Sequence, residues 1–326
     1  MQTDTSILSD AEILALRPAK NIVDSFRPFH YLVEPERTAA GNVEDAATIF
    51  LVNRECPWRC LMCDLWKNTT DESVPAGAVP AQIDYALARL PPARHVKLYN
   101  SGNFFDVRAI APADHAPIAQ RVARFATVIV ENHPKLCGEA CLRFRDLLGT
   151  NLEVALGLET VHPDVLPRLN KGMTLDDFAR AVEFLLSGGI AVRAFILLRP
   201  PYLSETEGIE WAVKSLEYAV SLGVGCCSLI PTRGGNGALA RLQAAGDFTP
   251  PRLRSLECVL EAGLALGRGR VFADLWDARR FDDCPACGPA RVARLAEMNL
   301  TQRLPPPVAC EACGDDPTVG RVLNLS

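Results

Sequence analysis

The sequence predicts an α/β fold, either a partial βα barrel or an open doubly wound sheet, with a small C-terminal four-cysteine extension. Six apolar runs of strand length alternate with segments of helical periodicity, and two Cys-x2-Cys pairs stand near the end of the chain. The apolar runs show little alternation with polar residues, which is typical of strands buried on both faces of a parallel sheet. Strands separated by helices predict right-handed βαβ units.

The six expected strands are rich in Val, Ile, Leu and Phe. They are Thr48–Val52, His95–Tyr99, Thr127–Glu131, Leu152–Leu158, Ala191–Leu197 and Gly223–Ile230. Two helices between them have start signals, because Thr174 with Asp177 and Ser204 with Glu207 have capping-box spacing. We expect these helices to end at Gly188 and Gly223.

We expect three parts along the chain. Residues 1–45 form an N-terminal extension with one short amphipathic helix, and residues 46–248 form the barrel. Residues 249–326 hold a helix from Thr249 to about Leu266, a short strand Arg270–Leu275, and the cysteine pairs.

Composition excludes several classes of protein. With 48% hydrophobic and 22% charged residues the chain can bury a sizeable core, which excludes a disordered or fibrous protein. Its net charge of −5 provides no overall basic field for nucleic acid. No apolar run approaches the roughly 18 residues of a membrane span, so we expect no membrane partner. The acidic start MQTDTSILSD is unlike a signal peptide. We therefore expect a cytoplasmic location, where reduced cysteines at regular spacing indicate metal binding.

The first cysteine cluster follows the first expected strand. Cys56, Cys60 and Cys63 have C-x3-C-x2-C spacing. Three thiolates so close together suit an iron–sulfur cluster, in which a cubane with three protein ligands leaves one iron free for another ligand. The alternatives are a zinc loop completed by a distant fourth ligand, or three unrelated thiols.

This loop, placed after the first strand of a six-fold βα pattern, resembles that of the radical S-adenosylmethionine (SAM) superfamily. The resemblance implies a partial six-stranded (βα) radical SAM barrel, a [4Fe–4S] cluster on the three cysteines, and SAM bound to the free iron. In that superfamily an electron from the cluster cleaves SAM, and the 5′-deoxyadenosyl radical abstracts a substrate hydrogen. A reductase or a ferredoxin-type protein would supply the electron. Met62 departs from the aromatic residue usual before the third cysteine, although its thioether can pack against adenine.

Further positions match the SAM contacts of the superfamily. Ser101, Gly102 and Asn103 match the turn that meets the SAM amino group. Glu131 and Glu159 end the third and fourth expected strands, and the carboxyl ends of parallel strands are where such sheets bind ligands. We expect them to hold the cationic sulfonium and the ribose.

Three basic residues are candidates for the SAM carboxylate. Lys171, in the stretch LNKG, matches the cation that related enzymes supply, although a solvated lysine beside a helix is the simpler alternative. Arg193 on the fifth strand and Arg199 at its end are further candidates, because a buried arginine needs a partner. The sequence does not choose between them, and it assigns no catalytic residue beyond the cluster cysteines.

Several stretches resemble, in order, the radical SAM subunit family of archaeosine synthase, which acts on a 7-deazaguanine base of tRNA. They are KLYNSGNFFD, VENHP, LEVALGLETVHPDVLPRLNKGMT, GDFTPPRLRSLECVL, and CPAC with MNLTQ. A compact cluster loop and the segment IPTRGGNG differ from that family. The resemblance implies tRNA modification. The acidic net charge favours instead a small-molecule or peptide substrate with an auxiliary iron–sulfur cluster. A non-catalytic metal-binding RNA adaptor is a third alternative, which the intact cysteine loop opposes.

The second cysteine set consists of two Cys-x2-Cys knuckles near the end of the chain. Its members are Cys284, Cys287, Cys310 and Cys313. Four thiolates paired in this way predict a closed tetrahedral zinc site or an auxiliary iron–sulfur cluster. With no open coordination position, we expect a structural or RNA-docking role. Buried packing explains the remaining five cysteines.

Overall fold

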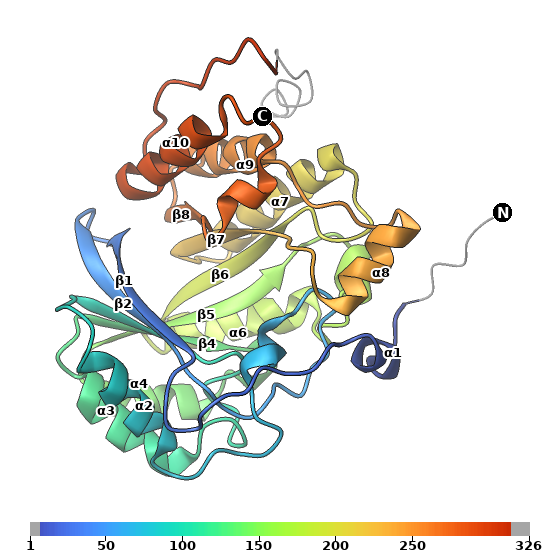
Figure 1. The fold of residues 1–326 in the computed structure, drawn as a ribbon. Helices are drawn as coiled ribbons and strands as arrows, with labels where there is room; N and C mark the ends of the chain where they lie inside the picture. The colour runs from blue at the N-terminus through green and yellow to red at the C-terminus, as the bar shows by residue number, and fades with distance from the viewer. Residues whose placement is uncertain (1–6, 314–326) are drawn as a thin grey trace.

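The computed structural model describes residues 7–313, which form one eight-stranded sheet that curls into a partial barrel (Figure 1). The strands are β1 His30–Arg37, β2 Val43–Phe50, β3 His95–Tyr99, β4 Thr127–Asn132, β5 Asn151–Glu159, β6 Ala191–Leu198, β7 Cys226–Pro231 and β8 Arg270–Ala273. They neighbour one another in sequence order. β1 is antiparallel to β2, and the pairs from β2 to β8 are all parallel.

Helices cover the outer side of the curled sheet (Figure 1). The α-helices are α1 Asp10–Ala15, α2 Ala78–Leu87, α3 His115–Val122, α4 Glu139–Leu148, α5 Val165–Arg168, α6 Leu175–Ser187, α7 Glu205–Ser221, α8 Gly237–Ala245, α9 Leu253–Ala265 and α10 Gly288–Thr301. Four short 3-10 helices are η1 Leu65–Asn68, η2 Pro112–Asp114, η3 Pro134–Leu136 and η4 Ala278–Phe281. Between residues 7 and 313, no helix combines the length and the apolar character that a membrane crossing needs.

The predicted fold class is confirmed. The six expected strands correspond to β2–β7, and the expected short strand corresponds to β8, which continues the same sheet. Both predicted capping boxes form, Thr174 with Asp177 on α6 and Ser204 with Glu207 on α7. Helix α9 begins four residues later than expected, because Pro250 and Pro251 each disfavour the helical conformation of the residue before them.

The elements that were not predicted include β1 and α10. β1 lies in the N-terminal segment, and α10 lies between the two cysteine pairs. β1 has no continuous apolar run, because its two faces differ. Tyr31 and Val33 pack against the core, whereas Glu34 and Glu36 form ion pairs. An apolar-run criterion does not detect such a strand.

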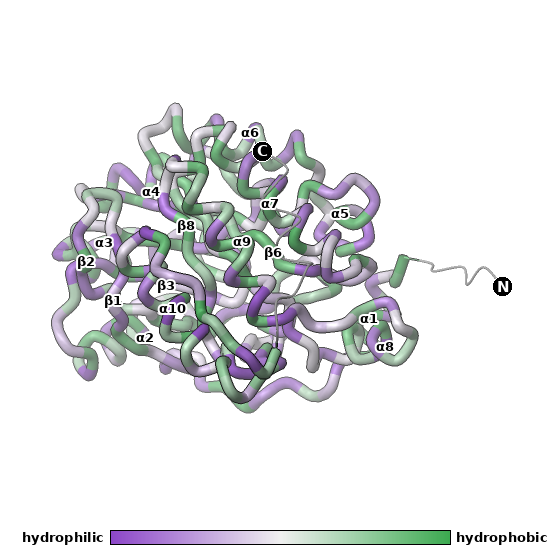
Figure 2. Tube along the Cα trace, turned by 90° about the horizontal axis from the view of Figure 1, so that it is seen from above, coloured by the Kyte–Doolittle hydropathy of each residue, from purple (hydrophilic) through white to green (hydrophobic). Residues whose placement is uncertain are grey.

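The main core lies between the sheet and the outer helices. Its largest fully buried side chains include Ile49, Leu98, Phe144, Leu156 and Phe178. Figure 2 shows hydrophilic and hydrophobic residues interspersed along the outer helices, as expected for helices with one buried face.

An ion-pair network joins strands of the sheet on the side where the parallel strands begin and the antiparallel strand β1 ends. Arg193 pairs with Glu36 and Glu153, both at 2.6 Å. Lys97 pairs with Glu36 at 2.6 Å, and Arg270 pairs with Glu153 at 3.0 Å. These five residues link β1, β3, β5, β6 and β8. Glu131 and Glu159 lie at the opposite, carboxyl-terminal ends of β4 and β5.

Candidate metal and cofactor site

The three cysteines of the first cluster lie between β2 and η1 and are half-buried. The Cys63 amide donates to the Cys60 carbonyl at 3.1 Å, which forms a tight turn between these two cysteines. The three thiols lie close enough to interact electrostatically, and burial raises the pKa of each, that of Cys63 to about 11. Three clustered thiols are the donor set of a cubane cluster that keeps one iron free.

Side chains and backbone from distant segments hold this cysteine loop. The Leu61 amide donates to the Leu169 carbonyl at 2.9 Å, and Asn170 Nδ2 donates to the Arg59 carbonyl at 3.0 Å. Asn236, the N-cap residue of α8, donates through Nδ2 to the backbone carbonyls of Leu61 and Cys63 at 3.0 and 3.1 Å. The loop is therefore anchored to both the α5–α6 connection and α8.

A buried ion pair lies beside the thiols. Lys171 Nζ contacts Glu159 Oε1 at 2.7 Å, and the lysine interacts electrostatically with Cys56 and Cys60. Burial opposes the charge of Lys171, but the Glu159 carboxylate together with Cys60 and Cys56 outweighs burial and raises the pKa of the lysine. Gly157 makes the pair possible, because a Cβ there would lie 2.1 Å from Glu159 Oε1 and 2.4 Å from Lys171 Nζ.

Glu131 lies at the end of the neighbouring strand β4. Its Oε2 accepts a hydrogen bond from the Asn100 amide at 3.2 Å. Burial raises the pKa of Glu131 to about 7, against the opposing effects of the Asn100 amide and Lys171. Its carboxyl group is therefore poised between the acid and the carboxylate near neutral pH, where a bound cation would favour the charged form.

The turn after β3 connects the cysteine loop with the strand ends. Asn103 Nδ2 donates to Cys56 Sγ at 3.3 Å. Ser101 adopts a left-handed φ of 50°, and Gly102 lies so close to Asn53 that a Cβ would be 3.1 Å from Asn53 Nδ2. Such a turn offers backbone amides to a ligand at close range.

Two amide side chains beside this turn have polar atoms without a hydrogen-bond partner. Among the described residues, the buried atoms without a hydrogen-bond partner include Asn53 Oδ1 and both amide atoms of Asn100. Both residues are fully buried. A buried polar group without a hydrogen bond costs free energy of desolvation. A polar ligand that binds these amide groups would offset that cost. A polar cofactor such as SAM therefore fits the residues present at the turn.

His133 and Trp58 were missed in the sequence. Their rings stack at 3.7 Å with an interplanar angle of 6°. His133 Nδ1 accepts from the Lys135 amide at 3.2 Å, so Nε2 carries the proton and donates to the Lys171 carbonyl at 3.1 Å. Burial lowers the pKa of His133 to about 3, which keeps the ring neutral. His133 thus joins the cysteine loop to Lys171. In the sequence, the one signal for a role of His133 at the site is its position two residues after Glu131.

Met62 and the two arginine candidates lie in different surroundings. Met62 is half-buried and packs with Tyr202 between two small apolar clusters. Arg193 lies in the ion-pair network at the other end of β6, so the structure does not bring it to the thiols. Arg199 pairs with Glu205 and donates to the Pro250 carbonyl. The residues brought together are Cys56, Cys60, Cys63, Asn103, Glu131, Glu159 and Lys171.

The four C-terminal cysteines come together as predicted. The sulfur atoms of Cys284, Cys287, Cys310 and Cys313 all lie within 4.8 Å of one another. They form the one group of three or more close metal-ligand side chains within residues 7–313. The grouping confirms a four-cysteine extension at the end of the fold.

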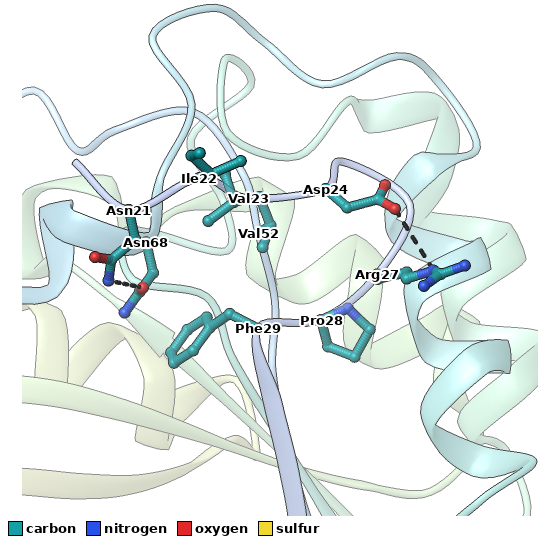
Figure 3. Close-up of a pocket in the computed structure, with 9 residues that line it drawn as sticks. All are labelled: Asn21, Ile22, Val23, Asp24, Arg27, Pro28, Phe29, Val52 and Asn68. Carbon is teal, nitrogen blue, oxygen red and sulfur yellow. Dashed lines mark hydrogen bonds and ion pairs between the residues drawn. The ribbon is translucent and has the colours of Figure 1, made fainter.

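A pocket of about 370 Å³ lies between the N-terminal segment and the two ends of the cysteine loop (Figure 3). Its polar groups satisfy one another. Asn21 donates to Asn68 at 2.8 Å, and Arg27 pairs with Asp24 at 3.5 Å. Its other lining residues are mainly apolar and include Phe29 and Val52, so we do not place the chemistry there.

Three known proteins have sequences similar to this chain. No family model matches the chain. Archaeosine synthase subunit beta of Methanosarcina acetivorans is 28% identical over 279 residues, which cover 78% of each chain. The same subunit of Thermococcus kodakarensis is 33% identical over 127 residues, covering 37% of this chain and 39% of that protein. An uncharacterized protein of Methanocaldococcus jannaschii is 23% identical over 74% of this chain and 71% of that protein.

Among solved structures, Elp3 of Methanocaldococcus infernus is 16% identical, with a TM-score of 0.49. The match covers 68% of this chain and 59% of the Elp3 chain. Coproporphyrinogen III oxidase of Escherichia coli, a radical SAM enzyme, is 14% identical with a TM-score of 0.45, covering 79% of this chain and 55% of that one. The resemblance to a subunit of archaeosine synthase inferred from the sequence is confirmed by these sequence relatives.

Proposed function

We propose that this chain, which resembles the radical SAM superfamily, is an enzyme that binds a [4Fe–4S] cluster through Cys56, Cys60 and Cys63 and binds SAM beside it. When bound, the cluster and SAM supply reductive cleavage of SAM and abstraction of a substrate hydrogen. The observation that carries the proposal is the buried Lys171–Glu159 pair within electrostatic range of Cys60. A cation beside a carboxylate suits a ligand that itself carries both charges.

The surrounding residues have distinct roles in the proposal. Lys171 would hold the SAM carboxylate, and Glu131 and Glu159 would face the sulfonium and the ribose. The turn of residues 101–103 would meet the amino group, while Met62 would pack against adenine. Supporting this arrangement, Glu131, Glu159 and Lys171 interact with one another or with the cluster cysteines.

We propose a modified tRNA base as the substrate, because two relatives of this chain are subunits of archaeosine synthase. The word "subunit" in their names supports a partner protein as well. The runner-up is a small molecule or peptide, which the net charge of −5 favours. A reductase or ferredoxin-type electron donor completes the proposed reaction.

A cytoplasmic location and the three-part division at residues 46 and 249 are also proposals. All twelve cysteines are free thiols, which suits a reducing compartment. The division has the weaker support, because β1 and β8, on either side of the proposed barrel segment, belong to the same sheet.

Anaerobic reconstitution with iron and sulfide tests the proposed cluster and cofactor. We expect about four irons per chain at the first cysteine set and SAM binding in equilibrium dialysis. Cys60→Ala should lose both. Cys258→Ala, which removes a buried thiol on the distant helix α9, should keep both. Wild-type protein that takes up no iron and binds no SAM would overturn the proposal.

A salt titration separates the two substrate classes. Binding of tRNA should weaken steadily as salt rises, because each phosphate contact releases a counterion. We expect this slope for unmodified or precursor tRNA measured with the reconstituted protein. The absence of any tRNA binding at low salt would favour the small-molecule or peptide substrate.

A further inference from the structure

The four C-terminal thiols are much more compact than the three loop thiols. Cys284 Sγ and Cys310 Sγ lie 3.8 Å apart, and Cys287 Sγ and Cys313 Sγ lie 3.5 Å apart. All four sulfurs are within 4.8 Å of one another, whereas the loop thiols do not form such a group in the part of the chain that the structure describes. One chain therefore carries two thiol sets of different spacing.

The spacing distinguishes one ion from a cluster. Thiolates bound tetrahedrally at about 2.3 Å from a single zinc ion lie about 3.8 Å from one another. In a [4Fe–4S] cluster each thiolate binds a different iron, and in a [2Fe–2S] cluster each of two irons binds two thiolates. In both, ligand sulfurs on different irons stand farther apart than sulfurs around one ion. We propose that Cys284, Cys287, Cys310 and Cys313 bind one tetrahedral zinc ion and not an auxiliary iron–sulfur cluster.

Neighbouring arginines match the charge of such a centre. Four thiolates around a divalent ion leave a net charge of −2. Arg291 Nε donates to Cys287 Sγ at 3.3 Å, and Arg254 donates to Cys313 Sγ. Arg291 is itself held by the Glu257 carboxylate on α9. Hydrogen bonds of this kind orient the ligands and stabilise the charge of a thiolate site.

The four-cysteine site joins the end of the described chain to helix α10 on the outer side of the sheet. Cys287 is the N-cap residue of α10, and the second knuckle follows a segment whose carbonyls accept from α10 arginines. Pro305 accepts from Arg294 at 2.7 Å. Helix α10 packs on α9, β8 and β1. The ion would therefore fix the helix that lies across the gap between the two ends of the sheet.

The site has a consequence for the redox chemistry. Four thiolates complete the coordination of zinc, and zinc has no redox chemistry of its own. The cysteine loop would then hold the single redox centre among residues 7–313. The expected metal content of the reconstituted chain is about four irons and one zinc.

Metal analysis of the variant Cys56→Ala/Cys60→Ala/Cys63→Ala tests the assignment. After anaerobic reconstitution and desalting, we expect one zinc per chain and no iron or sulfide. Iron with sulfide in this variant would overturn the zinc site in favour of an auxiliary cluster. One iron without sulfide would overturn zinc as the ion.

A second measurement keeps the test independent of folding and of the proposed enzyme. Wild-type protein made with Co²⁺ in place of Zn²⁺ should show the absorption bands of a tetrahedral four-thiolate site, and Cys313→Ser should weaken them. Octahedral cobalt bands would contradict the assignment. If wild-type protein holds zinc but never takes up iron, the proposed enzyme fails while the zinc site stands.

Discussion

Gly157 shows how one residue controls the candidate site. It lies on β5 below the Glu159–Lys171 pair and leaves the space that the two charged groups occupy. Glu159 has a left-handed φ of 67°, which is uncommon for a residue with a side chain. Surrounding contacts must hold this conformation, and such strained residues concentrate at functional sites.

We predict that Gly157→Ala weakens SAM binding at least about tenfold, equivalent to roughly 1.4 kcal/mol. The new methyl group would overlap both charged groups and force the pair apart. Equilibrium dialysis of the reconstituted protein measures the effect. Gly225→Ala is the matched control, because a Cβ there meets nothing within 4 Å. Equal SAM affinity of Gly157→Ala and wild type would contradict the assigned position of the cofactor.

His133 provides a second test at this scale. His133→Phe keeps an aromatic ring against Trp58 but removes the Nε2 donor to the Lys171 carbonyl and the Nδ1 acceptor of the Lys135 amide. A buried acceptor left without its donor costs about 1–3 kcal/mol, so we expect a lower free energy of unfolding by that amount. Urea denaturation measures it. A change below 0.5 kcal/mol would indicate that the hydrogen bond does not brace Lys171.

The sequence predicted the charged and thiol groups of the site but not the groups that position them. Cysteine spacing and strand-end carboxylates are local patterns. His133 and Asn236 act through contacts to residues 38 and up to 175 positions away, which no local pattern encodes. Arg193 had a buried-strand position that suited a ligand, but its partners are carboxylates from β1 and β5.

At the scale of elements, one side chain forms hydrogen bonds with both helix α8 and the cysteine loop. Asn236 Oδ1 caps α8 by accepting from the Leu239 amide, while Nδ2 binds two loop carbonyls. Asn236→Asp should keep the cap but lose both donations and set a carboxylate against two carbonyl oxygens. The cap and the loop contact can therefore be separated by a single substitution.

We predict that Asn236→Asp loses iron to a chelator several-fold faster than wild type. Absorbance of the cluster during the challenge gives the rate. Ser9→Ala, which removes the N-cap of α1 and leaves the loop contacts intact, is the control and should match wild type. Identical rates for wild type and Asn236→Asp would show that the Asn236 hydrogen bonds do not hold the loop.

The elements that could be predicted share a continuous apolar pattern. β2–β7 are buried on both faces, so local composition identified them. β1 carries Glu34 and Glu36, whose partners lie on β3 and β6 of the folded sheet, and its sequence therefore looks like an exposed segment. α10 was not predicted because the segment between the two cysteine pairs was interpreted only as part of a metal-binding extension.

At the scale of the whole molecule, buried ion pairs connect strands that are distant in sequence. Burial alone would raise the pKa of Glu36, but Arg193 and Lys97 outweigh burial and hold this pKa well below its usual value. In the unfolded chain Glu36 has an ordinary pKa near 4.3. The unfolded chain therefore binds a proton at acidic pH that the folded carboxylate does not bind. This contribution to stability is complete above about pH 5 and declines as the pH falls toward the folded pKa.

We predict that Glu36→Gln flattens the decline in the free energy of unfolding between pH 6 and pH 3. It should also lower stability at pH 7 by about 3 kcal/mol, since Arg193 and Lys97 lose a buried partner. Urea denaturation at each pH measures both effects. Glu217→Gln removes an exposed carboxylate on α7 and should change neither. If the free energy of unfolding of Glu36→Gln depends on pH as that of wild type does, the ion pairs of Glu36 are not a source of acid sensitivity.

Formation of 5′-deoxyadenosine by the anaerobically reconstituted and reduced protein tests the central claim most directly. We predict that wild type and Cys258→Ala produce it from SAM, and that Cys60→Ala produces none. A wild-type protein that holds its cluster, binds SAM and still forms no 5′-deoxyadenosine would contradict the assignment of this chain as a radical SAM enzyme.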